Sequence, residues 1–251
     1  MCHDHDSRPP APPRTGSVRE RGVLTLSAAD GTEVSAAYAA PEDEPHVGVV
    51  VLPDARGLHP FYVALAERFA QTGAAAVALD LFCRTAGVCG GSGTRDADFD
   101  WQTHMSQTTA EGVDADIAAA IAYLRERTAA DLPVVTVGFC FGGSHSWRQS
   151  GGDLDLAGCA GFYGKPSVVG PAAARAHLPT VMVIAGADAG TPVAEQLELA
   201  ETMRTAGADV DAAVYEGAPH SFFDRAYGEW EEACQDAWRH VLALIDRVAS
   251  R

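Results

Sequence analysis

The sequence is poor in positive charge. Its 251 residues include 18 Lys and Arg but 34 Asp and Glu, which gives a formal net charge of −16 at pH 7. Because nucleic-acid phosphates are bound by clusters of Lys and Arg, this imbalance argues against nucleic acid as a partner. It also argues against binding to an anionic membrane surface. We expect a small-molecule substrate, and a protein that is a monomer or a small homo-oligomer.

The sequence also lacks long apolar runs and closely paired cysteines. No run reaches the length of a membrane span, and the polar N-terminus is unlike a signal peptide, so we expect a cytoplasmic protein with free thiols. The cysteine spacing does not form a zinc site and no cofactor fingerprint occurs, so we expect neither a metal nor an organic cofactor. The six cysteines are Cys2, Cys83, Cys89, Cys140, Cys159 and Cys234.

The chain divides into an arm and one domain. Residues 1–20 are rich in Pro, Arg and Ser without periodicity, which predicts a disordered N-terminal arm. Residues 21–251 alternate strand-like apolar runs with helical patterns, which is typical of a mostly parallel sheet covered by helices on both faces, with no separate cap domain. A hairpin is predicted around Asp30-Gly31. The expected strands are 47–52, 75–79, 134–139, 157–162, 181–185 and 210–215, and the expected helices include 61–71, 191–205 and 230–248.

One of these strands leads into the run Gly138-Phe139-Cys140-Phe141-Gly142. This pattern resembles the Gly-x-Ser-x-Gly nucleophile elbow of α/β-hydrolases, with cysteine in the serine position. A sharp strand-to-helix turn strains the central residue, and side chains two positions away would clash, which explains the glycines. The Cys140 sulfur would then lie near a helix N-terminus, which favours negative charge. The alternative is a buried core cysteine, since short glycine patterns also arise by chance.

Two further residues complete a possible triad. Functional groups gather at the carboxyl ends of strands in such sheets, and Asp188 and His220 each follow a predicted strand there. The chain order of nucleophile, acid and base is the order that α/β-hydrolases use. Alternatively, Asp188 caps the helix that begins near Thr191, and His220 is an ordinary loop histidine. Three features in the right order and places favour the catalytic interpretation.

With these residues, the chain resembles the dienelactone hydrolase family, cysteine-bearing α/β-hydrolases that open lactone and ester bonds. The resemblance covers residues from about 22 to 250, and rests on the elbow, the Asp188 loop and the run Gly217 to Phe222, with Leu79 to Arg84 as a further match. It implies that Cys140 is the nucleophile, His220 the base and Asp188 the orienting acid. It also implies that Arg84 contacts a substrate carboxylate.

The chain departs from the family at two positions. Asp54 stands where the best-known member has a longer glutamate that is thought to help activate the thiol, and the alternative for Asp54 is a salt bridge to Arg56. At the position where the family has a second arginine, this chain has Asp224, and Arg225 follows one residue later. We expect Arg225, Ser221 and Tyr163 to contribute to substrate binding. Arg56, His59 and Lys165 are other possible anion contacts.

The expected chemistry follows from these assignments. The oxyanion would be held by the backbone N–H groups of Phe141 and Ala55. Cys140 would form an acyl-thioester that water then hydrolyses, which makes the protein an ester or lactone hydrolase. One form of this hypothesis gives the substrate a carboxylate group. The same site could instead serve an acyl transferase, a thioesterase or a cyclase of a biosynthetic pathway. A third possibility is a non-catalytic binding or redox-sensing protein.

Overall fold

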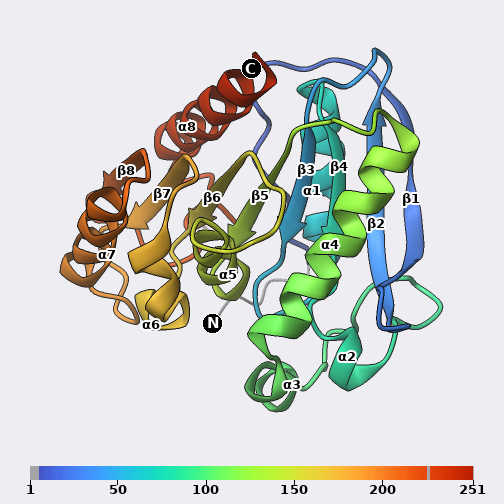
Figure 1. Ribbon diagram of the computed structural model, residues 1–251, viewed down its shortest axis with the longest axis horizontal. Helices are drawn as coiled ribbons and strands as arrows, with labels where there is room; N and C mark the ends of the chain where they lie inside the picture. Colours follow the sequence, from blue (N-terminus) through green and yellow to red (C-terminus); the bar gives the residue numbers. More distant parts are fainter. Residues whose placement is uncertain (1–5, 225–226, 251) are drawn as a thin grey trace.

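The fold is that of a single eight-stranded sheet with helices packed on both faces (Figure 1). The computed structural model describes residues 6–224 and 227–250. The strands lie in the order β1-β2-β4-β3-β5-β6-β7-β8. β1 and β2 form the expected hairpin, β2 is antiparallel to β4, and the other neighbouring pairs are parallel. The expected α/β-hydrolase architecture is confirmed.

The strands are β1 (Val18–Ser27), β2 (Glu33–Pro41), β3 (Gly48–Leu52), β4 (Ala75–Leu79), β5 (Val134–Phe139), β6 (Gly158–Phe162), β7 (Thr180–Ala185) and β8 (Val210–Tyr215). The helices are α1 (Pro60–Gln71), α2 (Cys83–Ala86), α3 (Trp101–Gln107), α4 (Ala110–Arg127), α5 (Phe141–Gln149), α6 (Pro166–Val169), the 3-10 helix η1 (Gly170–Arg175), α7 (Val193–Ala206) and α8 (Glu231–Ala249). No helix in the described part of the chain is long and apolar enough to cross a membrane.

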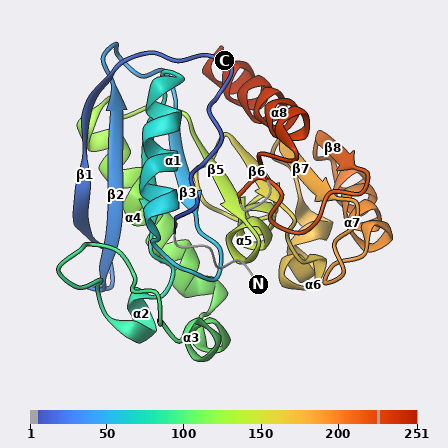
Figure 2. The ribbon, with the colours of Figure 1, turned by 180° about the vertical axis from the view of Figure 1, so that it is seen from behind.

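The central strands bury both of their faces, as their unbroken apolar sequences predict. Alternate residues of β3 point in opposite directions: Val49 and Val51 pack with α1 and α8, whereas Val50 and Leu52 pack with α4. A third cluster lies between the sheet and α5, α7 and η1. Thus α1 and α8 cover one face, and α4, α5 and α7 cover the other (Figures 1 and 2).

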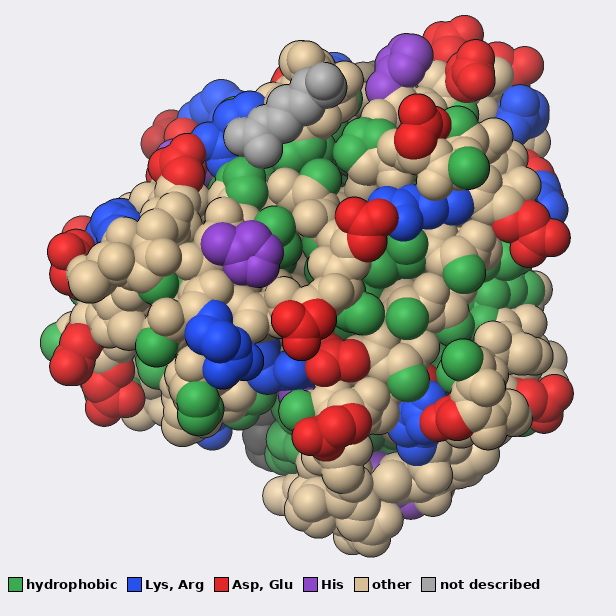
Figure 3. Space-filling view, in the orientation of Figure 1, with side chains coloured by type: hydrophobic (Ala, Val, Ile, Leu, Met, Phe, Trp, Pro, Cys, Tyr) green, Lys and Arg blue, Asp and Glu red, His purple; other side chains and the backbone are tan. Residues whose placement is uncertain are grey.

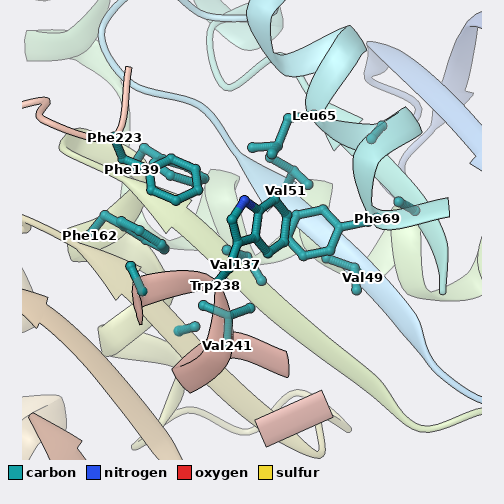
Figure 4. Packing of buried hydrophobic residues seen from close by; sticks show 14 of the residues in the cluster. Val49, Val51, Leu65, Phe69, Val137, Phe139, Phe162, Phe223, Trp238 and Val241 are labelled. Carbon is teal, nitrogen blue, oxygen red and sulfur yellow. The ribbon is translucent and has the colours of Figure 1, made fainter. Parts of the chain in front are cut away.

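Trp238 of α8 lies at the centre of the first of these layers. Its buried ring is surrounded by side chains of α1, β3, β5 and the loop that follows β8 (Figure 4). The ring centroids of Phe69 and Phe223 lie 5.0 and 5.7 Å from that of Trp238. Aromatic side chains of this size contribute much of the burial energy of a core. Trp238 therefore joins α8 to α1 and to the segment that carries Phe223.

The N-terminal arm differs from its expected disorder over residues 6–20. Pro9, Pro10 and Pro12 are buried, and the Trp238 indole N–H donates to the carbonyl of Pro10 at 3.2 Å. The arm runs between α1 and α8 before it enters β1, as the dark blue segment of Figure 2 shows. Proline has little backbone entropy to lose when the arm becomes ordered. The hydrogen bond from the buried Trp238 to the Pro10 carbonyl fixes which residue of the arm lies against α8. Residues 1–5 lie outside the described part of the chain.

Replacing Trp238 by Ala is expected to lower the free energy of unfolding by about 3–5 kcal/mol, since it opens a cavity in the core and removes the bond to the arm. Urea unfolding followed by circular dichroism measures this change. Glu232→Ala, at an exposed site on the same helix, is the control and should stay within about 0.5 kcal/mol of the wild type. A similar small effect for both variants would contradict the central role of Trp238.

Candidate active site

Cys140 sits at the turn between β5 and α5 in a strained backbone conformation. Its φ and ψ angles are 52° and −109°, which a non-glycine residue adopts only when its surroundings enforce it. A Cβ atom on Gly138 would overlap the backbone of Gly142, and one on Gly142 would overlap the carbonyls of Leu52 and Pro53. The steric reason given above for the two glycines is therefore confirmed. The thiol is half-buried, at the first turn of α5.

The loop that follows β3 packs directly against this turn. The amide of Gly142 donates to the carbonyl of Pro53 at 3.0 Å, which brings the Asp54-Ala55 segment alongside the start of α5. Phe141 is the first residue of α5, so its amide has no acceptor within the helix. The two backbone groups expected to hold an oxyanion thus belong to segments in contact.

Asp188 and His220 form the second part of the site. The Nδ1 atom of His220 lies 2.6 Å from Oδ2 of Asp188, and the amide of Gly190 donates to Oδ1 at 2.8 Å. Burial raises the pKa of Asp188, but the His220 hydrogen bond and the loop amides outweigh it, so the pKa lies below its usual value. An ionised carboxylate can only accept, so Nδ1 carries the proton and Nε2 is the basic nitrogen. Asp188 is not the N-cap of α7, which is Pro192.

Tyr163 and Ser221, expected to contribute to substrate binding, both border His220. The ring centroid of Tyr163 lies 4.8 Å from that of His220, and Ser221 is the next residue in the chain. Both are buried and have positive φ angles of 41° and 62°. Among the described residues, Cys140, Tyr163 and Ser221 are the non-glycine residues with positive φ. Strain of this kind clusters at functional sites, and no local sequence pattern predicts it at Tyr163 or Ser221.

Asp54 forms the salt bridge to Arg56 that is the alternative to thiol activation. Arg56 contacts the Asp54 carboxylate through Nε at 3.0 Å and Nη2 at 2.8 Å, and Nη2 also binds Asp224. Burial lowers the pKa of Arg56, but Asp54, Tyr62 and Asp224 together outweigh that effect, so the pKa is raised. Burial raises the pKa of Asp224 against the opposite influence of Arg56. Arg56 is therefore enclosed between two carboxylates. An arginine that binds the anionic group of a substrate would instead have part of its guanidinium open to that group.

Arg84 differs from the expected substrate contact. Its guanidinium binds Asp30 at 2.6 Å, Asp116 at 2.9 Å and the carbonyl of Gly112 at 3.0 Å. These partners belong to the β1–β2 turn and to the first turns of α4. The Arg84 side chain therefore extends from the short helix α2 toward α4 and the β1–β2 turn. The position of Arg84 after a strand does not predict this direction. Arg225, the other expected arginine, lies outside the described residues.

Arg95 is a largely buried cation that no sequence pattern singled out. Its Nε atom lies 2.8 Å from Oδ2 of Asp80, the carboxylate at the end of β4. The amide of Arg95 donates to the carbonyl of Leu58. Arg95 therefore joins the segment after α2 both to Asp80 and to the loop after β3. Phe82 stacks on Phe141 with centroids 5.8 Å apart. These contacts pack the segments on both sides of α2 against the loop after β3 and the start of α5.

A metal centre finds no support in the described part of the chain, where no group of three or more His, Cys, Asp or Glu side chains is placed to hold an ion. On the face shown in the space-filling view, acidic side chains are scattered with basic ones between them (Figure 3). The cysteines described in the structure are all free thiols. At the carboxyl ends of the strands, the fold places a strained cysteine after β5, an Asp–His pair after β7 and β8, and a buried Arg cluster after β3.

Known proteins share this architecture. A model of the dienelactone hydrolase family matches residues 34–249. A protein of Saccharolobus solfataricus named "Putative carboxymethylenebutenolidase" is 26% identical over 256 residues, covering 88% of this chain and 96% of its own. Protein usf of Aquifex pyrophilus is 29% identical over 147 residues, 57% of this chain and 64% of its own length.

Solved structures show the same fold. A crystal structure titled as a putative dienelactone hydrolase from Klebsiella pneumoniae superposes with a TM-score of 0.76 at 22% identity, covering 91% of this chain and 98% of that chain. The Pyrococcus furiosus esterase Pf2001 superposes with a TM-score of 0.68 at 15% identity, covering 94% and 98%.

The Asp188–His220 pair predicts a pH-dependent contribution to stability. Because the folded-state pKa of Asp188 lies below the usual 3.8, the stabilisation is present above about pH 4 and is lost as the pH falls through the lowered pKa. Asp188→Asn should therefore be less stable than the wild type at pH 6, and the difference should shrink toward pH 3. Urea unfolding across this range measures it. Asp155→Asn, at a largely exposed carboxylate, is the control; a difference that grows on acidification would contradict the assignment.

Proposed function

Since the chain belongs to the dienelactone hydrolase family and is a carboxylic ester hydrolase, we propose that Cys140 is its nucleophile and that it opens lactone or ester bonds through an acyl-thioester. The observation that carries the proposal is the Asp188–His220 pair, which follows β7 and β8 at the edge of the sheet where the strained Cys140 follows β5. A carboxylate that fixes the imidazole tautomer is the arrangement that prepares a histidine to take a proton from a nucleophile.

In the first step, the Cys140 sulfur attacks the carbonyl carbon and its proton passes to Nε2 of His220. The positive end of α5 favours the thiolate. The oxygen of the tetrahedral intermediate accepts hydrogen bonds from the amides of Phe141 and Ala55. The C–O bond then breaks, and the leaving alcohol takes the proton from His220.

In the second step, water replaces the thiol. His220 takes a proton from the water, and the resulting hydroxide attacks the thioester carbonyl. The C–S bond then breaks, which releases the acid, and the departing sulfur takes the proton back from His220, which restores Cys140. Thiolates suit esters with good leaving groups, such as aryl and enol esters. A lactone has an internal leaving alcohol, so a single hydroxy acid is the product.

Asp54 and Arg84 receive no chemical role in this proposal. The Asp54 carboxylate is held by Arg56, and Arg84 is bound by Asp30 and Asp116. Tyr163 and Ser221 remain candidates for substrate contacts, because both adjoin His220. We therefore propose lactones and esters as substrates without assigning them a carboxylate.

Replacing Cys140 by Ala should reduce turnover of p-nitrophenyl acetate and of a simple aryl lactone by at least about a thousandfold, because the covalent route is lost. Brief reaction of the wild type with the acetate ester should add one acetyl group, located on Cys140 by peptide mass spectrometry. Cys89→Ala, which removes another free thiol, should keep both turnover and the adduct. Undiminished turnover by the Cys140 variant would refute the covalent mechanism.

A further inference from the structure

A buried ion cluster connects two loops of the proposed site. The side chain of Arg56 is 4% exposed, and those of Asp54 and Asp224 are each 3% exposed. Asp54 belongs to the loop that follows β3, and Asp224 belongs to the turn that follows His220, 168 residues from Arg56. Removing charges from water is unfavourable by several kcal/mol for each ion unless partners replace the water. The arrangement is therefore fixed: Arg56 can leave neither carboxylate without stranding a buried charge.

The guanidinium is also held in place by aromatic rings. Its central carbon lies 5.4 Å from the ring centroid of Phe61 and 5.5 Å from that of Tyr62. The hydroxyl oxygen of Tyr62 accepts from the amide of Asp54 at 3.0 Å. A planar cation that stacks on rings and bonds two carboxylates uses properties that lysine does not have.

On one side, the cluster sets the conformation of the residue between its first two members. The amide of Arg56 donates to Oδ1 of Asp54 at 2.9 Å, and the amide of Gly57 donates to the carbonyl of Asp54 at 3.1 Å. These two bonds close a tight turn around Ala55, whose amide is a proposed oxyanion donor. Arg56 holds this turn from its side-chain end as well.

On the other side, the cluster reaches the turns that carry His220. The amide of Asp224 donates to the carbonyl of Ser221 at 3.0 Å, and the amide of Phe222 donates to that of Pro219 at 3.2 Å. His220 lies within these overlapping turns. A displacement of Asp224 would thus be transmitted to the proposed base.

The N-terminal arm completes the cluster. Nη1 of Arg56 donates to Oγ of Ser7 at 3.1 Å, and the arm is anchored nearby through Pro10 and Trp238. The arm precedes the residues that the family model matches, which begin at 34. Ser7 therefore adds a contact to the ion cluster from outside the matched region.

We propose that Arg56 is a positioning residue: it holds the Ala55 turn and the His220 turn in one arrangement, and the N-terminal arm secures it through Ser7. This inference rests on the proposed function, because it gives Arg56 its role relative to the oxyanion donor and the base. Arg56 itself does not touch the substrate in this assignment, since its side chain is buried and bound by two carboxylates.

Arg56→Lys tests the inference, because lysine keeps the charge but cannot bridge both carboxylates with a planar fork. We expect kcat on p-nitrophenyl acetate to fall about tenfold or more while KM stays within about threefold, since the lost alignment acts mainly in the transition state. Arg125→Lys is the matched control, because Arg125 pairs with Asp155 near the amino end of β5. It should keep the wild-type kcat. Thermal unfolding of each variant identifies a loss of folded protein.

Ser7→Ala provides a milder second variant in case Arg56→Lys does not fold. Losing one hydrogen bond to a charged group should lower kcat by a few fold and the melting temperature by only a few degrees, so the variant stays folded. Ser17→Ala, at an exposed site of the same arm, should have no effect.

An unchanged kcat in a folded Arg56→Lys protein, or a rise in KM alone, would overturn the inference. Should only Ser7→Ala fold, an unchanged kcat in that variant would overturn it instead. A wild type without ester or lactone turnover counts against the proposed function itself, so the two failures are distinguishable.

Discussion

The site depends on how closely the elbow approaches the end of β3. Gly142 lies against the carbonyls of Leu52 and Pro53 with no room for a Cβ atom, and its amide bonds to Pro53. This contact holds the turn on which Cys140 adopts its strained conformation, and it brings the loop that carries Ala55 alongside the start of α5. A larger residue at 142 would separate the nucleophile from the loop that supplies the second amide. The glycine is thus a requirement of the active-site geometry as much as of the turn.

The charges of this acidic chain follow a consistent pattern. Arg56, Arg84 and Arg95 all lie near the carboxyl edge of the sheet, and each is bound by at least one buried aspartate. A carboxylate close to a guanidinium removes most of its attraction for a third group. Arginines in these positions therefore organise loops. The same reasoning explains why a cation recognised by its position in the sequence need not bind substrate.

The sequence predicted what depends on short-range patterns and missed what depends on distant partners. The strands, α1, α8 and the steric need for glycine near Cys140 follow from periodicity and local geometry. The arm was expected to be disordered because its composition lacks periodicity, yet it packs through a bond to Trp238 that sequence proximity does not show. Likewise, Asp54 and Arg56 are neighbours whose pairing could be weighed, whereas the third member, Asp224, could not be found by spacing.

The three strained residues show how such a site holds together. Residues with positive φ other than glycine are unfavourable by about 1–3 kcal/mol each, so each needs compensation from its surroundings. The amide of Cys140 donates a hydrogen bond to the carbonyl of Phe162. The amide of the next residue in the chain, Tyr163, donates to the carbonyl of Val183. The Tyr163 ring then lies against His220, beside the strained Ser221. Hydrogen bonds between the ends of β5, β6 and β7 thus connect the backbone of Cys140 to that of Tyr163, which contacts His220. The aromatic rings of Phe139, Phe162 and Phe223 pack on one another beside these strand ends, so a change at one strained residue would have to displace a close-packed core.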